Sequence, residues 1–190
     1  YVLQKYSKLP KNMCVGMAGV LDSSRMKFFL SEALDVSIND VETFVLGGHG
    51  DDMVPLVNYT TIGGIPLMDY IKLKNIPSSK IQKIVDRTRM GGGEIVKLLK
   101  RGSAFYAPAS SAIQMAEAFL LNQKKLLPCA AYLNGQYGLK NMYMGVPTII
   151  GRKGIEKIIE VKLSANEKSM LKKSVKSVQG LVSAVDKILK

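Results

Sequence analysis

The sequence has few of the residues that metal centres and disulfide frameworks need. Its 190 residues include one histidine and two cysteines, Cys14 and Cys129. Both cysteines lie in apolar surroundings without CxxC spacing, so the sequence gives no support for a bound metal or a disulfide. We expect two buried free thiols instead, because free cysteine behaves as a small apolar residue.

Long apolar runs are missing as well. No stretch approaches the roughly 20 apolar residues that a membrane-spanning helix needs, and nothing resembles a secretory signal peptide. With 47% hydrophobic and 22% charged residues, the composition is typical of one compact globular domain over residues 1–190. We therefore expect a cytoplasmic protein with no membrane partner.

Acidic residues are scarce relative to basic ones. The sequence has 15 Asp and Glu against 27 Lys and Arg, which gives a formal net charge of +12. The lysines are scattered along the whole chain, and aromatic residues do not alternate with them, so we do not expect a nucleic-acid partner. The excess charge predicts solvated helix faces and some attraction of an anionic substrate.

Hydrophobic periodicity predicts an α/β (α+β) protein in which antiparallel hairpin strands pack with long helices. Gly63-Gly64 predicts a hairpin turn, and Ser164 to Glu167 has the pattern of a capping box. Ser78 or Ser79 is expected to cap a helix that Gly91-Gly92-Gly93 interrupts. The expected strands cover 14–18, 41–46, 53–62, 126–133, 143–150 and 155–163, and the expected helices cover 1–9, 21–34, 78–99, 108–121 and 164–189.

Three side chains are candidates for chemistry. His49 lies in the turn Gly47-Gly48-His49-Gly50-Asp51 after a strand-like run, where the glycines leave the imidazole uncrowded. Asp22 and Arg25 are three residues apart at a helix start and so share one face. Taken separately, a lone histidine is commonly structural, and such an acid–base pair is commonly a local ion pair.

Together the three side chains match the needs of oxidising a 2-hydroxy acid. The guanidinium of Arg25 can bind the substrate carboxylate in a two-pronged fork. The imidazole of His49, with a pKa near neutrality, can take the alcohol proton and return it in the reverse reaction. The carboxylate of Asp22 can bind the other ring nitrogen, which fixes the tautomer and favours the imidazolium.

Four ordered segments of the sequence resemble the malate and lactate dehydrogenases, particularly the lactate-dehydrogenase-like malate dehydrogenases. Val15 to Arg25 is similar to the family segment with the aspartate and the substrate arginine, and Gly47 to Asp51 is similar to the catalytic histidine motif. Gly91 to Val96 and Gly102 to Pro108 resemble the helix and turn that close over the nicotinamide and the substrate. The resemblance runs over nearly the whole chain and implies the C-terminal, substrate-binding domain of that fold.

The resemblance also implies functions for individual residues. His49 and Asp22 correspond to the catalytic pair, and Arg25 corresponds to the substrate arginine. Additional substrate contacts are implied for Ser103 and Ala104, and nicotinamide (NAD) contacts are implied for Met17, Leu21 and Pro108.

The dinucleotide-binding half of that family is not recognisable in this sequence. No GxGxxG follows a strand-like run, and Gly91-Gly92-Gly93 is no substitute because it falls inside a helical pattern. The mobile loop with its additional arginines is missing too. We therefore expect that sequence lies upstream, and that residues 1–190 alone are inactive.

Three functions remain open at this point. The residues of the Gly91 to Pro108 region and of Tyr143 to Pro147 resemble malate dehydrogenases more than lactate dehydrogenases. L-Lactate dehydrogenase is the alternative, since the three candidate residues are common to both. In both cases the resemblance implies NAD as cofactor, a small 2-hydroxy or 2-oxo acid as substrate, and a homodimer or homotetramer. The third possibility is a non-catalytic assembly domain that uses the apolar faces of helices 26–34 and 171–189.

Overall fold

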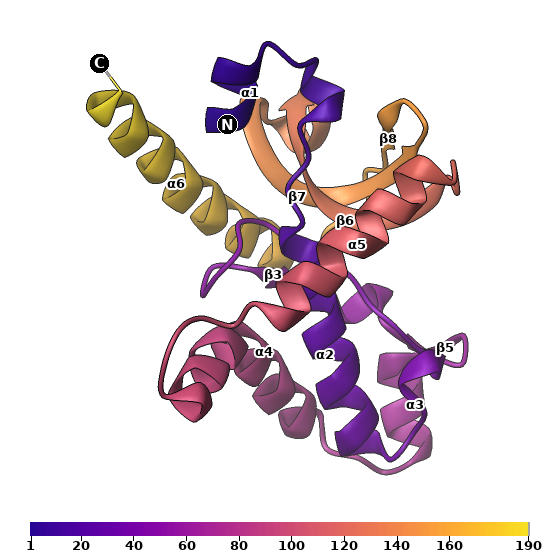
Figure 1. Ribbon diagram of the computed structural model, residues 1–190. Helices are drawn as coiled ribbons and strands as arrows, with labels where there is room; N and C mark the ends of the chain where they lie inside the picture. Colours follow the sequence, from indigo (N-terminus) through magenta and orange to yellow (C-terminus); the bar gives the residue numbers. More distant parts are fainter. Residues whose placement is uncertain (190) are drawn as a thin grey trace.

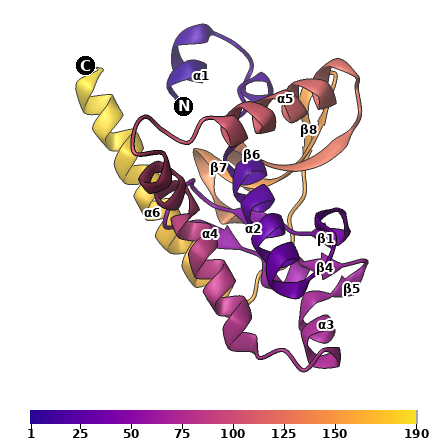
Figure 2. The ribbon, with the colours of Figure 1, turned by 60° about the horizontal axis from the view of Figure 1, so that its bottom comes forward.

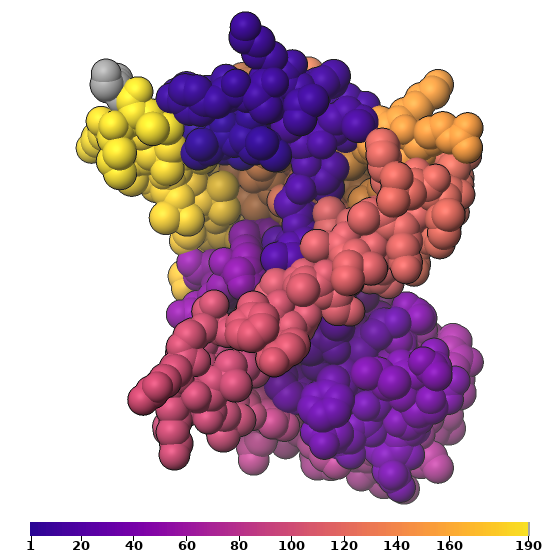
Figure 3. All heavy atoms as spheres, in the orientation of Figure 1, coloured from indigo at the N-terminus to yellow at the C-terminus, as the bar shows by residue number. Residues whose placement is uncertain are grey.

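The computed structural model describes residues 1–189. Their elements form two groups, which helix α2 (Ala18–Leu34) joins (Figures 1, 2 and 3). One group contains the sheet of β6, β7 and β8 with α5 beside it, and the other contains α3, α4 and the short strands β1, β4 and β5. The helices are α1 (Val2–Ser7), α2 (Ala18–Leu34), α3 (Leu67–Leu73), α4 (Ser78–Leu99), α5 (Tyr106–Leu120) and α6 (Ala165–Ile188). The strands are β1 (Val41–Glu42), β2 (Val45–Leu46), β3 (Val54–Pro55), β4 (Thr61–Ile62), β5 (Ile65–Pro66), β6 (Lys125–Asn134), β7 (Lys140–Gly151) and β8 (Gly154–Ile158).

The main sheet is an antiparallel meander in the order β6-β7-β8. In the middle of β7, alternate residues such as Met142 and Met144 are buried, and Met144 pairs with Ala131 of β6. The short strands form two further antiparallel sheets, β1-β4-β5 and β2-β3. The expectation of antiparallel hairpins packed with long helices is confirmed, including the turn at Gly63-Gly64 between β4 and β5.

Helix α2 contributes to two of the three apolar cores. Met26 and Leu30 are fully buried against α3 and α4, whereas Val20 is buried with Ala118 of α5 and Leu127 of β6. The third core lies between the main sheet and the first half of α6. The 26–34 stripe is therefore interior to this chain, which removes it as the assembly face considered above.

Several strand boundaries differ from the predictions. The run at 14–18 forms only a single bridge, Gly16 to Ala130, because α2 already begins at Ala18. The expected strand 41–46 is two strands with different partners: β1 pairs with β4, whereas β2 pairs with β3. The expected strand 53–62 is divided by a turn of 3-10 helix at residues 57–59, and the strand expected to reach 163 ends at Ile158.

The helices also differ in places from the predictions. Helix α4 is continuous through Gly91-Gly92-Gly93, and its N-cap is Pro77 without a side-chain cap from Ser78 or Ser79. Helix α5 begins at Tyr106, two residues before the expected start. The capping box of α6 is present: Ser164 Oγ accepts from the Glu167 N–H, and the Glu167 carboxylate accepts from the Ser164 N–H.

The two cysteines are free and buried, as predicted. Cys129 lies in the middle of β6 with no exposed surface, and burial raises the pKa of its thiol to about 12. A thiol that stays protonated at neutral pH is a poor nucleophile and a poor metal ligand. Both cysteines therefore act as apolar packing groups.

The turn that carries His49 docks on the main sheet through two glycines. Gly47 and Gly145 exchange backbone hydrogen bonds, with N···O distances of 2.9 and 3.0 Å. A Cβ on Gly145 would overlap the carbonyl oxygen of Gly47, so this close approach requires glycine at position 145. The histidine turn is thereby fixed to β7.

The first prediction concerns this glycine pair. Gly145→Ala should lower the free energy of unfolding by about 2 kcal/mol or more, because the added methyl group must push the turn away from β7. The measurement is urea unfolding followed by circular dichroism. Gly180→Ala is the matched control: Gly180 lies inside α6 with open space around its missing Cβ, so this change should stabilise by about 0.5 to 1 kcal/mol. Equal stability of the Gly145→Ala variant and the unchanged protein would contradict the prediction.

Candidate active site

Helix α2 places Asp22 and Arg25 on one face, as the three-residue spacing predicts. Both lie inside the helix, because α2 begins at Ala18 and not at Asp22. Arg25 Nη1 lies 3.6 Å from Asp22 Oδ1, and the side chains are 9% and 2% exposed. The pair is therefore an acid and a base that are both withdrawn from water.

His49 completes the cluster from the other side. Its Nδ1 lies 3.0 Å from each carboxylate oxygen of Asp22, while the imidazole is 49% exposed. A carboxylate accepts hydrogen bonds, so Nδ1 carries the proton, and in the neutral imidazole Nε2 is left as an acceptor. The structure thus brings together the three residues that the sequence singled out.

The environment favours the protonated form of this histidine. The hydrogen bond to Asp22 raises the pKa of His49 above its ordinary value of 6.5, and the negative charge of Asp22 acts in the same direction. Desolvation and the positive charge of Arg25 oppose the increase. The imidazole can therefore accept a proton near neutral pH and hold it on a carboxylate-supported ring.

The guanidinium of Arg25 packs against α4 where that helix has glycines. A Cβ on Gly91 would lie 3.1 Å from Arg25 Cδ, and a Cβ on Gly92 would lie 3.5 Å from Arg25 Nη1. Gly91 and Gly92 therefore make room for a side chain, and they do not interrupt the helix as the sequence predicted. Within residues 1–189 no acceptor reaches the buried Arg25 Nε, which leaves a donor available for an anion.

One residue that the sequence analysis missed joins α2 to the histidine strand. Ser23 Oγ accepts a hydrogen bond from the backbone N–H of Val45, with an N···O distance of 2.9 Å, and this contact is buried. Gly19 assists, since a Cβ there would lie 2.6 Å from the Val45 carbonyl oxygen. No signal in the sequence marks Ser23, because its partner lies 22 positions away and is brought close only by the fold.

The resemblance also implied substrate or cofactor contacts for five further residues. They lie at the start of α2, in the loop between α4 and α5, and in the first turn of α5. Met17 is the partly buried N-cap of α2, and Leu21 is 3% exposed immediately before Asp22. Ser103 and Ala104 lie in the loop between α4 and α5, and Pro108 lies in the first turn of α5. No hydrogen bond within residues 1–189 joins these loop residues to the three clustered side chains, so their functions stay predictions.

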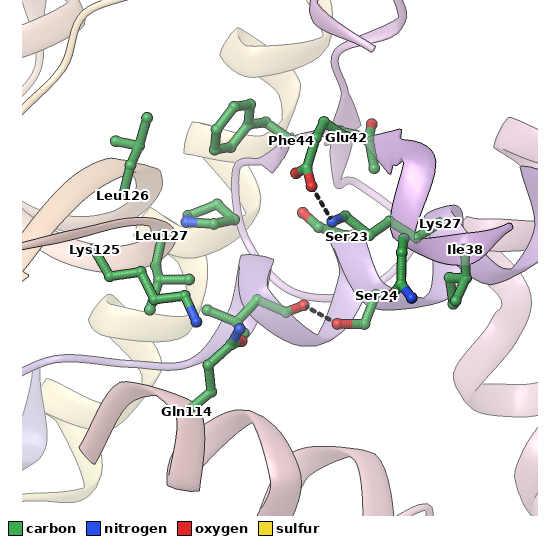
Figure 4. A pocket seen from close by; sticks show the side chains of 14 residues that line it. Ser23, Ser24, Lys27, Ile38, Glu42, Phe44, Gln114, Lys125, Leu126 and Leu127 are labelled. Atoms are coloured by element: carbon green, nitrogen blue, oxygen red, sulfur yellow. Dashed lines mark hydrogen bonds and ion pairs between the residues drawn. The ribbon is translucent and has the colours of Figure 1, made fainter. Parts of the chain in front are cut away.

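A separate cleft of about 430 Å³ lies beside another face of α2 (Figure 4). Lys27 of α2 and Glu42 of β1 form an ion pair at 2.9 Å within it, and Gln114 of α5 and Lys125 of β6 line the opposite side. Asp22, Arg25 and His49 do not line this cleft. The chemistry of the cluster therefore does not take place there.

Two other classes of site receive no support from the described residues. Within residues 1–189, no three His, Cys, Asp or Glu side chains are grouped so that they could hold a metal ion. In the same part of the chain, none of the helices has the length and hydropathy to cross a bilayer. The cluster of Asp22, Arg25 and His49 is therefore our candidate active site, because it combines a proton acceptor, its carboxylate partner and a guanidinium.

Comparison with known proteins agrees with this geometry. Residues 19–189 match the family model of the lactate/malate dehydrogenase alpha/beta C-terminal domain. The malate dehydrogenase of Cryptosporidium parvum superposes with a TM-score of 0.95 at 50% identity, over 97% of this chain and 59% of that one. The lactate dehydrogenase of Eimeria maxima, solved with NADH and oxamate, gives 0.94 at 46% identity, over 98% and 58%. The malate dehydrogenase of Salinibacter ruber gives 0.93 at 47% identity, over 99% and 60%.

The chain belongs to the lactate/malate dehydrogenase family, and its fold is the C-terminal α/β domain of that family. The family is one of oxidoreductases. This chain spans about three fifths of the length of the three structures compared above. The resemblance derived from the four sequence segments is therefore confirmed at the level of family and fold.

The second prediction concerns the Asp22 carboxylate. Asp22→Asn should lower the pKa of His49, because the change removes the negative charge and replaces one of the two acceptor oxygens by an NH2 donor. His49 is the only histidine in the sequence, so proton NMR follows its titration without assignment. Glu156→Gln is the control, since Glu156 pairs with Lys124 and should leave the histidine unchanged. An unaltered His49 titration in Asp22→Asn would refute the electrostatic coupling.

The same pair links folding to pH. Because the pKa of His49 is raised in the folded state, the stability from the His49–Asp22 pair is fully present below the unfolded-state pKa, near 6.5. That contribution decreases as the pH rises through the folded-state pKa. The histidine is half exposed, so we expect a small effect, visible as the difference between the unfolding curves of the unchanged protein and Asp22→Asn.

The third prediction uses two neighbouring glycines of α4. Gly91→Ala should weaken binding of a small carboxylate such as oxamate by about tenfold, or roughly 1.4 kcal/mol, because the new methyl group displaces the Arg25 side chain. Gly93→Ala has open space around the added methyl group and should bind oxamate normally, while stabilising α4 by about 1 kcal/mol. Titration calorimetry measures the binding, and similar affinities for both variants would contradict the assignment of Gly91.

Proposed function

We propose that this chain forms the substrate-binding half of an NAD-dependent malate dehydrogenase, which interconverts malate and oxaloacetate. The observation that carries the proposal is the cluster of Asp22, Arg25 and His49, in which one buried carboxylate holds a half-exposed imidazole and a buried guanidinium. The family assignment supports an oxidoreductase. The cluster supplies groups for the proton and for the substrate carboxylate.

In the direction of alcohol oxidation, His49 Nε2 accepts the hydroxyl proton of the 2-hydroxy acid. Asp22 holds the ring through Nδ1 and stabilises the imidazolium that forms. Arg25 binds the substrate carboxylate, and its unpartnered buried Nε is one donor for that bond. In the reverse direction His49 returns the proton to the carbonyl oxygen.

The residues present fit one part of a nicotinamide site. Met17 is partly buried and lies on α2 less than two turns before Asp22, so its thioether can contact an apolar ring edge near the reacting centre. Pro108 offers a second partly buried apolar group. When bound, NAD supplies the acceptor for the hydride that leaves the carbon bearing the hydroxyl group. The sequence contains no GxGxxG fingerprint for the phosphates of the cofactor.

L-Lactate dehydrogenase is the close alternative for the same site. The compared malate dehydrogenases share 50% and 47% identity with this chain, and two lactate dehydrogenases share 46% and 44%. The three clustered residues act on the carboxylate and hydroxyl groups that both substrates possess. We favour malate because the residues of the Gly91 to Pro108 region resemble those of malate dehydrogenases. A comparison of kcat/KM for oxaloacetate with kcat/KM for pyruvate decides between the two activities.

The proposal extends to assembly and location. Tyr106, Ile113 and Leu120 of α5 follow one another at seven-residue intervals and are 75%, 59% and 70% exposed. This apolar stripe supports packing against another domain or subunit, in line with a homodimer or homotetramer. We place the protein in the cytoplasm on the composition of the sequence alone. A purely non-catalytic assembly function is disfavoured, because assembly alone does not require a buried aspartate that holds a histidine and an arginine.

The fourth prediction tests the catalytic cluster in the full-length protein. His49→Asn should lower kcat by about three orders of magnitude, because the proton acceptor is lost, while NADH binding stays near normal. Arg25→Lys should raise KM strongly, since lysine cannot reproduce the two-pronged carboxylate contact. Steady-state kinetics with NADH fluorescence titration measures both, and turnover within tenfold of normal for His49→Asn would overturn the proposed mechanism.

The same measurement has a defined pH dependence. Oxidation needs neutral His49, so its rate should increase as the pH rises through the raised pKa of this histidine. Reduction of the 2-oxo acid needs the imidazolium, so its rate should decrease over the same range. In Asp22→Asn both transitions should move to lower pH.

A further inference from the structure

The turn that carries His49 is attached to α6 as well as to the main sheet. The backbone N–H of Gly48 donates to Ser174 Oγ with an N···O distance of 2.8 Å, across 126 positions of the sequence. Ser174 has no exposed surface. Gly48 directly precedes His49, so this hydrogen bond fixes the Gly47–Gly48 peptide unit, one residue before the histidine.

The packing around this hydrogen bond is close. A Cβ on Gly47 would lie 2.7 Å from Ser174 Oγ, and a Cβ on Gly48 would lie 2.9 Å from Val178 Cγ2. Both glycines therefore allow the histidine turn to approach α6. The sequence suggested that Gly47 and Gly48 leave the imidazole uncrowded. The structure shows that they also allow close packing against α6.

A second contact with α6 holds the far end of the turn. The Asp52 carboxylate accepts from Ser177 Oγ at 2.5 Å and lies 2.7 Å from Lys173 Nζ. The Lys173 side chain is 77% exposed, and surface ion pairs of this kind contribute little. The Ser174 bond is different because its acceptor comes from a side chain with no exposed surface and the bond itself is partly buried, so loss of the hydroxyl group removes the Gly48 N–H acceptor where access of water is restricted.

We propose that Ser174 is a positioning residue for His49, whose hydroxyl group holds the imidazole where Nδ1 meets both oxygens of Asp22. The catalytic meaning rests on the proposed function, but the orientation itself is measurable without turnover. Without this bond the turn samples more conformations, and the imidazole spends less time on the carboxylate. The charged groups that face the turn are Asp22 and Arg25 from α2, Arg89 from α4, and Lys173 from α6.

The test compares Ser174→Ala with Ser183→Ala in the full-length protein. Ser183 is an exposed serine farther along α6, so its replacement controls for the loss of a hydroxyl group from this helix. Proton NMR titration of His49, whose signal is assigned by its loss in His49→Asn, and steady-state kinetics are the two readouts. For Ser174→Ala we expect the pKa of His49 to move toward 6.5, and kcat to fall about tenfold with KM changed less than about twofold. Ser183→Ala should change neither.

The results separate positioning from simple support of the fold. A Ser174→Ala variant that melts at lower temperature but keeps the normal His49 titration and normal kcat overturns the proposal. Ser174→Cys keeps the volume and weakens the acceptor, so an intermediate titration is expected; this variant replaces Ser174→Ala if the latter does not fold. If His49→Asn retains turnover, the proposed function fails, yet the histidine titration still decides whether Ser174 positions the ring.

Discussion

The carboxylate of Asp22 is the group on which the site depends. A charge that is withdrawn from water is costly unless opposite charges and hydrogen bonds surround it. Asp22 meets this condition with His49 on one side and Arg25 on the other, at 3.0 and 3.6 Å. Its removal leaves the buried Arg25 guanidinium and the half-exposed His49 imidazole without the negative charge that both contact. The same carboxylate therefore stabilises the local structure and holds the proton on Nδ1 of the His49 imidazole.

The elements around Asp22 approach one another through small residues. Gly145 lets the histidine turn bond to β7, Gly19 lets α2 lie against the strand that leads to the turn, and Gly91 leaves room for Arg25 beneath α4. In each case a methyl group would occupy the space of a neighbouring atom. The site is thus held by backbone contacts and a few buried hydroxyl groups, and large side chains fill the three apolar cores on either side.

The sequence predicted the long elements and the cluster better than the short strands. Repeated apolar spacing identifies α2, α4 and α6, because each buries a stripe over many turns. The segment 41–62 was misread, since its strands are two residues long and change partners between Glu42 and Val45. Such pairing is decided by tertiary contacts that local pattern does not contain.

The site residues likewise fall into those that the sequence identified and those that only the structure reveals. Asp22, Arg25 and His49 were identified by residue type and motif, and the structure brings them together. Ser23 and Ser174 were missed because a serine that caps or braces a distant backbone amide looks like any other helical serine in the sequence. The three glycines of α4 were noticed, but the partner of Gly91 and Gly92, the Arg25 side chain 66 positions earlier than Gly91, is visible only in three dimensions.

A consequence follows from the position of Asp22 and Arg25 on one helix. Because less than one turn of α2 separates the two residues, helical geometry fixes the distance between the carboxylate that holds His49 and the guanidinium of Arg25. Under the proposed function, this fixed distance serves the carboxylate and hydroxyl groups that all 2-hydroxy acids share. Substrates could then differ in the rest of their carbon skeleton without any change in α2.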